Sequence, residues 1–236
     1  MLDDTKALAG NMLLATLSRA DAALVSPWLE NFEMILQKEL YQTHQSIDFA
    51  YFPLGGICSV IAENAQGTRV ETGLIGREGF VGIPIILFAE KASSRIIVQA
   101  PGRALRMSST KLLEAIELSR SFHKLLLQFA HVFSVQVTQA AISNAHNTIQ
   151  QRVARWFLMC QDRADAREFP MTHEFLSKMI DVRRAGVTDA LASLEGIYAI
   201  KALRNRVIIL DRSILEEIAG GSYSVAEKEY ARLIPA

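Results

Sequence analysis

The chain has 236 residues, of which 50% are hydrophobic and 21% charged, and its 25 basic and 25 acidic side chains give a formal net charge of +0. This composition predicts a globular protein with room for two modest domains, and it excludes a disordered chain and a binder driven by overall positive charge. Cys58 and Cys160 are the two cysteines and lie far apart, which excludes a disulfide framework or a four-thiolate metal site within one chain. No apolar run approaches the ~18 residues of a membrane span, and the N-terminal Met-Leu-Asp-Asp lacks the basic start of a signal peptide, so we expect a cytoplasmic protein without a membrane contact.

The first hundred residues change from helical to β-rich patterns. Residues 11–40 contain two helical stretches, with start signals at Ser18 and at Ser26-Pro27. Short runs rich in β-branched residues then follow between glycines, at 47–52, 57–62, 69–74, 96–100 and 104–107. Their even spacing predicts a small antiparallel barrel or roll.

After Ser109 glycine and proline are absent for about sixty residues, and the apolar spacing predicts one long amphipathic helix. Its stripe consists of Phe122, Leu126, Phe129, Phe133 and Val137, continued by Ala140 and Asn144. Because so long a stripe is difficult to bury within a roll and one small domain, we expect it to pair with the same helix of a second subunit. The alternative is an ordinary helix packed on its own domain.

The C-terminal third has the pattern of a DNA-binding module. A hinge at 144–147, with Asn147 as cap, leads to a helix at 149–161. Residues 172–195 have the apolar spacing of two helices joined by a tight turn, and the second helix opens with Arg183 and Arg184. Residues 200–211 predict a two-stranded wing with a polar tip, and the local charge balance here is slightly positive.

In this order the segments resemble the Crp/Fnr family of bacterial transcription regulators. The resemblance rests on residues 51–60 and 79–82 in the roll, and on residues 151–158, 172–194 and 207–211 in the DNA-binding part. It implies an α+β fold with a cyclic-nucleotide-binding-like antiparallel β-roll (double-stranded β-helix), a long dimerisation helix and a C-terminal winged helix-turn-helix. The implied domains are a sensor roll with N-terminal helices at 1–118, the dimerisation helix at 119–145 and the DNA-binding domain at 146–236.

The resemblance also implies which residues contact DNA. Arg184 takes the place of a base-reading arginine, and a bidentate contact with guanine would contribute roughly 1–3 kcal/mol of discrimination. Ala185 and Asp189 take two further base-reading places but depart from the residues usual there, which leaves the operator sequence open. The full set of expected DNA contacts is Thr172, His173, Arg183, Arg184, Thr188, Asp189, Arg204 and Arg206.

The expected effector pocket departs from that of cyclic-AMP-binding relatives. The ribose-binding glutamate of those relatives is replaced by Ile83, and the arginine of their phosphate-binding pair stands one position later, in Ser94-Arg95. Because neighbouring strand residues point to opposite faces, Arg95 is expected to point away from the pocket. The candidate pocket residues are Gly79, Val81, Gly82, Ile83, Ser94 and Arg95. The apolar segment at 83–88 favours a hydrophobic or planar ligand over a nucleotide. A regulator without an effector is also possible.

No cofactor or metal is expected. Two cysteines cannot supply the four-cysteine iron–sulfur cluster of the oxygen-sensing relatives, and His44, His123, His131 and His146 are more typical of ordinary polar positions than of haem ligands. Paired carboxylates, a Ser–His–acid set and a P-loop are also missing from the sequence, so we expect no enzymatic activity.

The expected function is therefore that of a homodimeric, sequence-specific transcription regulator, with an effector other than cyclic AMP or none. Its expected partners are double-stranded DNA with a two-fold symmetric operator and RNA polymerase. The alternative is a ligand-binding module whose winged helix contacts a protein. The effector, the operator bases, the target genes and the choice between activation and repression are left open.

Overall fold

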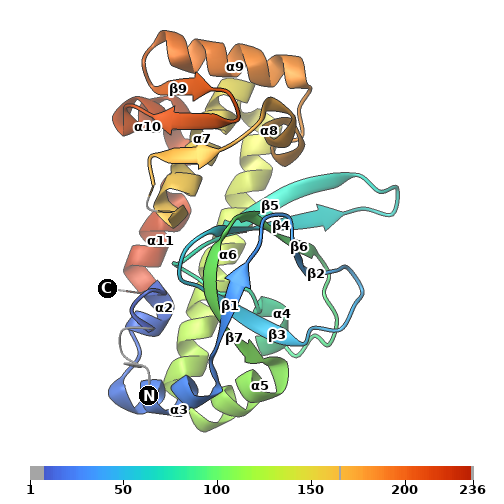
Figure 1. Ribbon diagram of the computed structural model, residues 1–236, viewed down its shortest axis with the longest axis vertical. Helices are drawn as coiled ribbons and strands as arrows, with labels where there is room; N and C mark the ends of the chain where they lie inside the picture. Colours follow the sequence, from blue (N-terminus) through green and yellow to red (C-terminus); the bar gives the residue numbers. More distant parts are fainter. Residues whose placement is uncertain (1–7, 165, 235–236) are drawn as a thin grey trace.

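One long helix, α6 (Arg120–His146), runs along the molecule and joins its two ends (Figure 1). The computed structural model describes residues 8–164 and 166–234, so Met1–Asp4, which bear on the signal-peptide prediction, lie outside the described residues. A roll of strands lies to one side of α6, and the C-terminal helices and a small sheet lie at its far end (Figure 1).

The N-terminal segment confirms one predicted helix and corrects the other. After the short α2 (Met12–Ala15), Ser18 caps α3 (Arg19–Val25), as predicted. Pro27 opens only a 3₁₀ turn, η1 (Ser26–Trp28), and the chain then forms strands β1 (Glu30–Met34) and β2 (Glu39–Tyr41). The predicted second helical stretch is therefore wrong, because pairing with strands distant in sequence overrides local helix propensity.

The five predicted β-rich runs all form strands of the roll. They are β3 (Phe49–Pro53), β4 (Ile57–Glu63), β5 (Arg69–Ile75), β6 (Arg95–Ala100) and β7 (Gly102–Ser108). Two antiparallel sheets with the orders β1-β7-β3 and β2-β6-β4-β5 enclose the roll's apolar core. The turn before β4 needs Gly56, since its φ is 81° and a Cβ there would lie 2.6 Å from the Ala100 carbonyl oxygen.

The long helix predicted at 119–145 corresponds to α6, and a separate shorter helix, α5 (Ser109–Leu118), precedes it. Ser119 separates them: its hydroxyl accepts a hydrogen bond from the Phe122 amide at 3.0 Å and donates one to buried Asp21. At the other end of α6 the predicted cap is also corrected. Asn147 ends α6, whereas Thr148 and Gln151 exchange backbone and side-chain hydrogen bonds at the start of α7 (Ile149–Ala164).

The C-terminal part contains the predicted helix-turn-helix and wing, followed by two helices that were not predicted. Strand β8 (Glu168–Pro170) joins the wing strands β9 (Ile200–Leu203) and β10 (Arg206–Ile209) in the order β8-β10-β9. The two helices of the motif are α8 (His173–Met179) and α9 (Arg184–Gly196). After α10 (Arg212–Ala219) and a 3₁₀ turn, η2 (Gly220–Ser222), helix α11 (Val225–Leu233) returns along α6 toward α2 (Figure 1).

Candidate DNA-binding surface and sensor pocket

The first helix of the motif, α8, begins at an exposed threonine. The Thr172 hydroxyl accepts a hydrogen bond from the Phe175 amide at 3.1 Å, which satisfies one free N–H of the first turn. Next to it, His173 Nδ1 lies 3.0 Å from the Thr188 hydroxyl of α9. Thr172 and His173 therefore lie together at the start of α8, and His173 connects the two helices.

Arg152, a residue that the sequence analysis did not select, contacts the turn between α8 and α9. Asp181 has a φ of 48°, and the Val182 amide donates to the Ser177 carbonyl at 3.0 Å. Arg152 of α7 donates to the carbonyl of Ile180, the last residue before Asp181. The Arg152 contact holds the turn against α7. It therefore helps to set the direction in which α9 extends from the turn.

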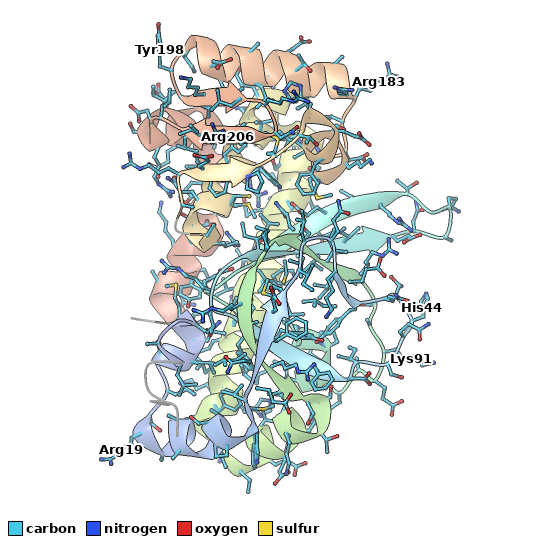
Figure 2. All side chains as sticks on the ribbon, in the orientation of Figure 1. Arg19, His44, Lys91, Arg183, Tyr198 and Arg206 are labelled. Atoms are coloured by element: carbon cyan, nitrogen blue, oxygen red, sulfur yellow. The ribbon has the colours of Figure 1, made fainter. Side chains whose placement is uncertain are left out.

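Helix α9 buries one face and leaves the other free. Val187, Ala190, Leu191 and Leu194 are buried against α7 and the wing. The exposed face carries Arg184, Ala185, Thr188, Asp189 and Ala192. Arg183 is the N-cap residue, its side chain makes no capping bond, and it marks the start of α9 in Figure 2. An exposed helix face that opens with two arginines and continues with small side chains suits insertion into a major groove.

The wing carries two arginines with different surroundings. Arg204 lies at the exposed tip of the β9–β10 hairpin, where Asn205 has a φ of 61° and its carbonyl accepts from the Met171 amide at 2.9 Å. Arg206 instead forms an ion pair with Glu168 of β8 at 2.8 Å. In Figure 2 Arg206 lies below α9, apart from Arg183 at its start. Of the two wing arginines, Arg204 is the freer to approach a phosphate.

The roll contains a cavity of about 260 Å³ between its second sheet, α4 (Ile83–Ile86) and α6. Among the predicted pocket residues, Gly82, Ile83 and Ser94 line it. Gly79 does not, because it packs beneath the Phe129 ring, where a Cβ would lie 2.0 Å from Phe129 Cζ. The predicted set is therefore only partly brought together.

The two remaining predicted pocket residues also lie elsewhere. Val81 is buried and exchanges backbone hydrogen bonds with Tyr51 at 2.7 and 2.8 Å. Arg95 pairs with Glu39 at 2.6 Å and lies in the separate cleft between the roll and α8. Strand β6 begins at Arg95, and the alternation of side chains along it places Ile96 at the cavity and Arg95 on the opposite side.

The cavity wall is apolar and carries no charged side chain. Tyr41 lines the cavity, but its hydroxyl already donates a hydrogen bond to the Phe49 carbonyl at 2.7 Å, and burial raises the pKa of Tyr41. Ser93 and Ser94 supply the other hydroxyls. Phe133 of α6 closes the cavity at the back, so a ligand here would contact the long helix directly.

The predicted subunit-interface stripe of α6 faces the protein's own core. Phe122 and Leu126 are 0% exposed and Phe129 is 2% exposed, all within the core of the roll. The prediction that these three contact a second subunit is therefore wrong, because α6 is the wall against which the roll packs. Phe133 is half-buried against the same core, and Val137 is half-buried one turn farther on.

Comparison with known proteins identifies the DNA-binding part. Residues 151–218 match the family model described as a Crp-like helix-turn-helix domain. The part of the chain that this model covers is therefore a Crp-like helix-turn-helix domain.

Solved structures share the fold along most of the chain. A putative Crp/Fnr transcriptional regulator from Eubacterium rectale is 14% identical, with a TM-score of 0.68, covering 89% of this chain and 99% of that one. FixK2 from Bradyrhizobium japonicum is 14% identical, with a TM-score of 0.70 and coverage of 82% and 98%. The c-di-GMP-responsive regulator CLP from Xanthomonas campestris is 13% identical, with a TM-score of 0.66 and coverage of 82% and 100%. No curated protein sequence matches.

Contacts between the roll and the DNA-binding part were missed by the sequence reasoning. Gln136 of α6 bonds both the amide and the carbonyl of Leu74, at 2.7 and 3.1 Å. Arg163 of α7 is buried, pairs with Glu78 at 3.0 Å and donates to the Leu74 carbonyl. Glu71 accepts a hydrogen bond from Trp156. In the sequence, Glu71 and Glu78 look like ordinary strand and loop carboxylates, because no local pattern indicates that another domain covers them.

Groups of three or more His, Cys, Asp or Glu residues placed to hold a metal ion are absent from the part of the chain that the structure describes. By length and composition α6 is apolar enough to cross a membrane, although its apolar residues form no uninterrupted run.

Proposed function

We propose that this protein is a transcription regulator of the Crp/Fnr type, a cytoplasmic homodimer that reads a two-fold symmetric operator through α9 and acts on transcription with RNA polymerase. The observation that carries the proposal is the exposed face of α9, which begins at Arg184 and continues with Ala185 and Thr188. Arg183 and Arg204 flank this face as phosphate contacts. In a dimer the two α9 helices would enter successive major grooves about 34 Å apart.

A second copy of the chain is the proposed occupant of the free face of α6. The exposed residues there include Leu127, His131, Ser134, Thr138, Ala141, Ile142 and Ala145. Leu127, Ser134 and Ala141 are seven residues apart, the repeat that keeps one seam of a helix facing a partner helix. The small side chains permit close approach. Hydroxyls and a histidine on the same face favour a protein partner over lipid.

The proposed effector is not cyclic AMP. Ile83 lines the cavity at the place of the ribose-binding glutamate, and Arg95 lies outside it in an ion pair with Glu39. An apolar cavity without a charged side chain leaves a cyclic phosphate uncompensated, which makes its desolvation costly. An uncharged, largely apolar small molecule fits this wall better, and calorimetry with cyclic AMP should show no micromolar binding.

Selection of bound duplexes from a random DNA pool tests the DNA-reading proposal. The unmodified protein should enrich a two-fold symmetric site. Arg184→Ala should lose preference at one base pair of each half-site, by roughly 10- to 100-fold. Arg19→Ala is the matched control, because Arg19 lies at the opposite end of the molecule from α9 (Figure 2) and should leave the selected site unchanged. Unaltered base preference in Arg184→Ala would contradict the base-reading role.

A further inference from the structure

A carboxylate of the roll contacts the DNA-binding part directly. Glu71 lies on β5, the edge strand of the second sheet, which packs against both α7 and α8. Its Oε1 accepts a hydrogen bond from the indole Nε1–H of Trp156 on α7 at 2.9 Å. The contact therefore joins the sensor roll to the domain that carries the helix-turn-helix.

The second oxygen of Glu71 has no partner. The Glu71 side chain is partly exposed as a whole, but Oε2 itself is buried and has no hydrogen-bond partner among the described residues. The nearest guanidinium groups are used elsewhere: Arg155 donates to the Ser222 carbonyl at 2.9 Å, and Arg163 pairs with Glu78. An ionised carboxylate in this place would be buried without a paired cation, which is costly.

The surroundings of Glu71 favour its neutral form. Burial raises the pKa of Glu71 to about 7, and the hydrogen bond from Trp156, the nearby Ser59 hydroxyl and the positive charges of Arg155 and Arg163 only partly oppose that rise. The charged and titratable groups around Glu71 on the packed elements include Arg69 on β5, Glu63 on β4, Arg95 on β6, Arg155, Cys160 and Arg163 on α7, Lys178 on α8 and Asp181 in the turn. Arg69, Arg95 and Lys178 already pair with Glu63, Glu39 and Glu174.

Trp156 connects this carboxylate to the helix-turn-helix. The indole is 5% exposed and meets the Phe175 ring of α8 edge-on, with 6.3 Å between ring centroids. Phe175 follows Thr172, whose hydroxyl caps α8, by three residues. A displacement of Trp156 would therefore shift Phe175 and the first turn of α8.

We propose that the Glu71–Trp156 contact is a proton-dependent latch between the sensor roll and the DNA-binding domain. When the domains dock, Glu71 takes up a proton from solvent, and release of that proton weakens the docking. This regulation goes beyond the proposed effector response, since it uses neither the apolar cavity nor the subunit interface. The signal it reads is the pH of the surrounding solution.

The sign and the size of the effect follow from proton linkage. An undocked Glu71 would ionise near 4.5, its ordinary pKa, and the docked one near 7. Below pH 4.5 the proton is bound in both arrangements and docking does not depend on it. As pH rises from 4.5 to 7 docking weakens, and above 7 the docking equilibrium constant is lower by up to roughly 300-fold.

Trp156 is itself the reporter for the test. The chain has two tryptophans, so Trp28→Phe leaves Trp156 as the only indole fluorophore. In that background we expect a change in Trp156 emission between pH 5 and 9 with a midpoint near 7. Glu71→Gln keeps an oxygen acceptor for the indole but cannot ionise, and should remove the transition. Glu63→Gln, on the neighbouring strand in an exposed ion pair with Arg69, is the matched control and should retain it.

Two outcomes would overturn the proposal. The first is an emission transition that persists when Glu71→Gln is added to the Trp28→Phe protein. The second is the absence of any pH-dependent emission transition in the Trp28→Phe protein itself. A measurement on the unmodified chain is independent of how well Glu71→Gln folds: hydrogen exchange of the two indole N–H groups, followed by NMR. The exchange rate of Trp156 relative to that of Trp28 should rise as pH passes through 7. A ratio that stays constant from pH 5 to 9 would also refute the latch.

Discussion

Replacing Phe129 by alanine should destabilise the fold and leave the subunit contact untouched. The ring is 2% exposed, packs 5.6 Å from the Phe80 ring centroid and covers Gly79. Loss of a fully buried phenyl ring combines lost transfer free energy with the energy of the remaining cavity, about 3–5 kcal/mol. Gly79 offers no side chain to fill the space, so the upper half of that range is expected.

Urea denaturation followed by circular dichroism checks the magnitude. The midpoint should fall while the slope of free energy against urea stays unchanged, because the same surface is exposed on unfolding. Leu118→Ala is the control, since Leu118 is 63% exposed at the end of α5 and should lose less than about 0.5 kcal/mol. The destabilisation by Phe129→Ala should be the same at every protein concentration. If the loss of stability disappears at high protein concentration, Phe129 contributes to the subunit interface and its assignment to the core is refuted.

Three further changes test other parts of the structure. Gly79→Ala should lower stability by about 1–3 kcal/mol in thermal unfolding, because the new Cβ would overlap the Phe129 ring. Adding Phe129→Leu should restore part of the lost stability in the double variant. Full stability of Gly79→Ala would contradict this packing. Ala141→Lys should yield a monomer by sedimentation without loss of helix content, whereas Thr110→Lys, exposed at the start of α5, should remain a dimer; an unchanged mass for Ala141→Lys would remove the proposed interface. Burial alone would raise the pKa of Asp21, but hydrogen bonds from Ser119, Ser121 and Ser18 lower it overall, so its contribution to stability is present above pH 3.8 and lost as pH falls through its depressed pKa. Asp21→Asn should therefore destabilise the protein at pH 7 and progressively less as pH falls below 3.8, and a loss that does not change with pH would contradict the hydrogen-bonded carboxylate.

Elements with a local signature could be predicted from the sequence. Glycine-bounded runs located five strands of the roll, Ser18 marked the start of α3, and the paired apolar spacing at 172–195 located α8 and α9. The two-residue period of a strand also predicted that Arg95 points away from the pocket. In each case the information lies within a few neighbouring residues.

Features decided by distant partners could not be predicted in this way. Residues 30–34 and 39–41 form strands because β7 and β6 pair with them, although their local pattern favours a helix. The apolar spacing of α6 identified its buried face correctly as apolar, but it could not show whether the roll or a second subunit covers that face. Glu71 and Arg163 acquire their roles only when two domains meet around them.

The last helix gives the chain an unusual order of assembly. Tyr230 and Leu233 pack against the core of the roll, and Ile234 belongs to that core with 3% exposure, so the first domain in sequence is completed by residues at the far end of the described chain. On a ribosome, the roll would emerge with this part of its core uncovered and remain so until the whole DNA-binding domain had been synthesised. Truncation before α11 should therefore impair folding of the sensor roll first, far in sequence from the residues removed.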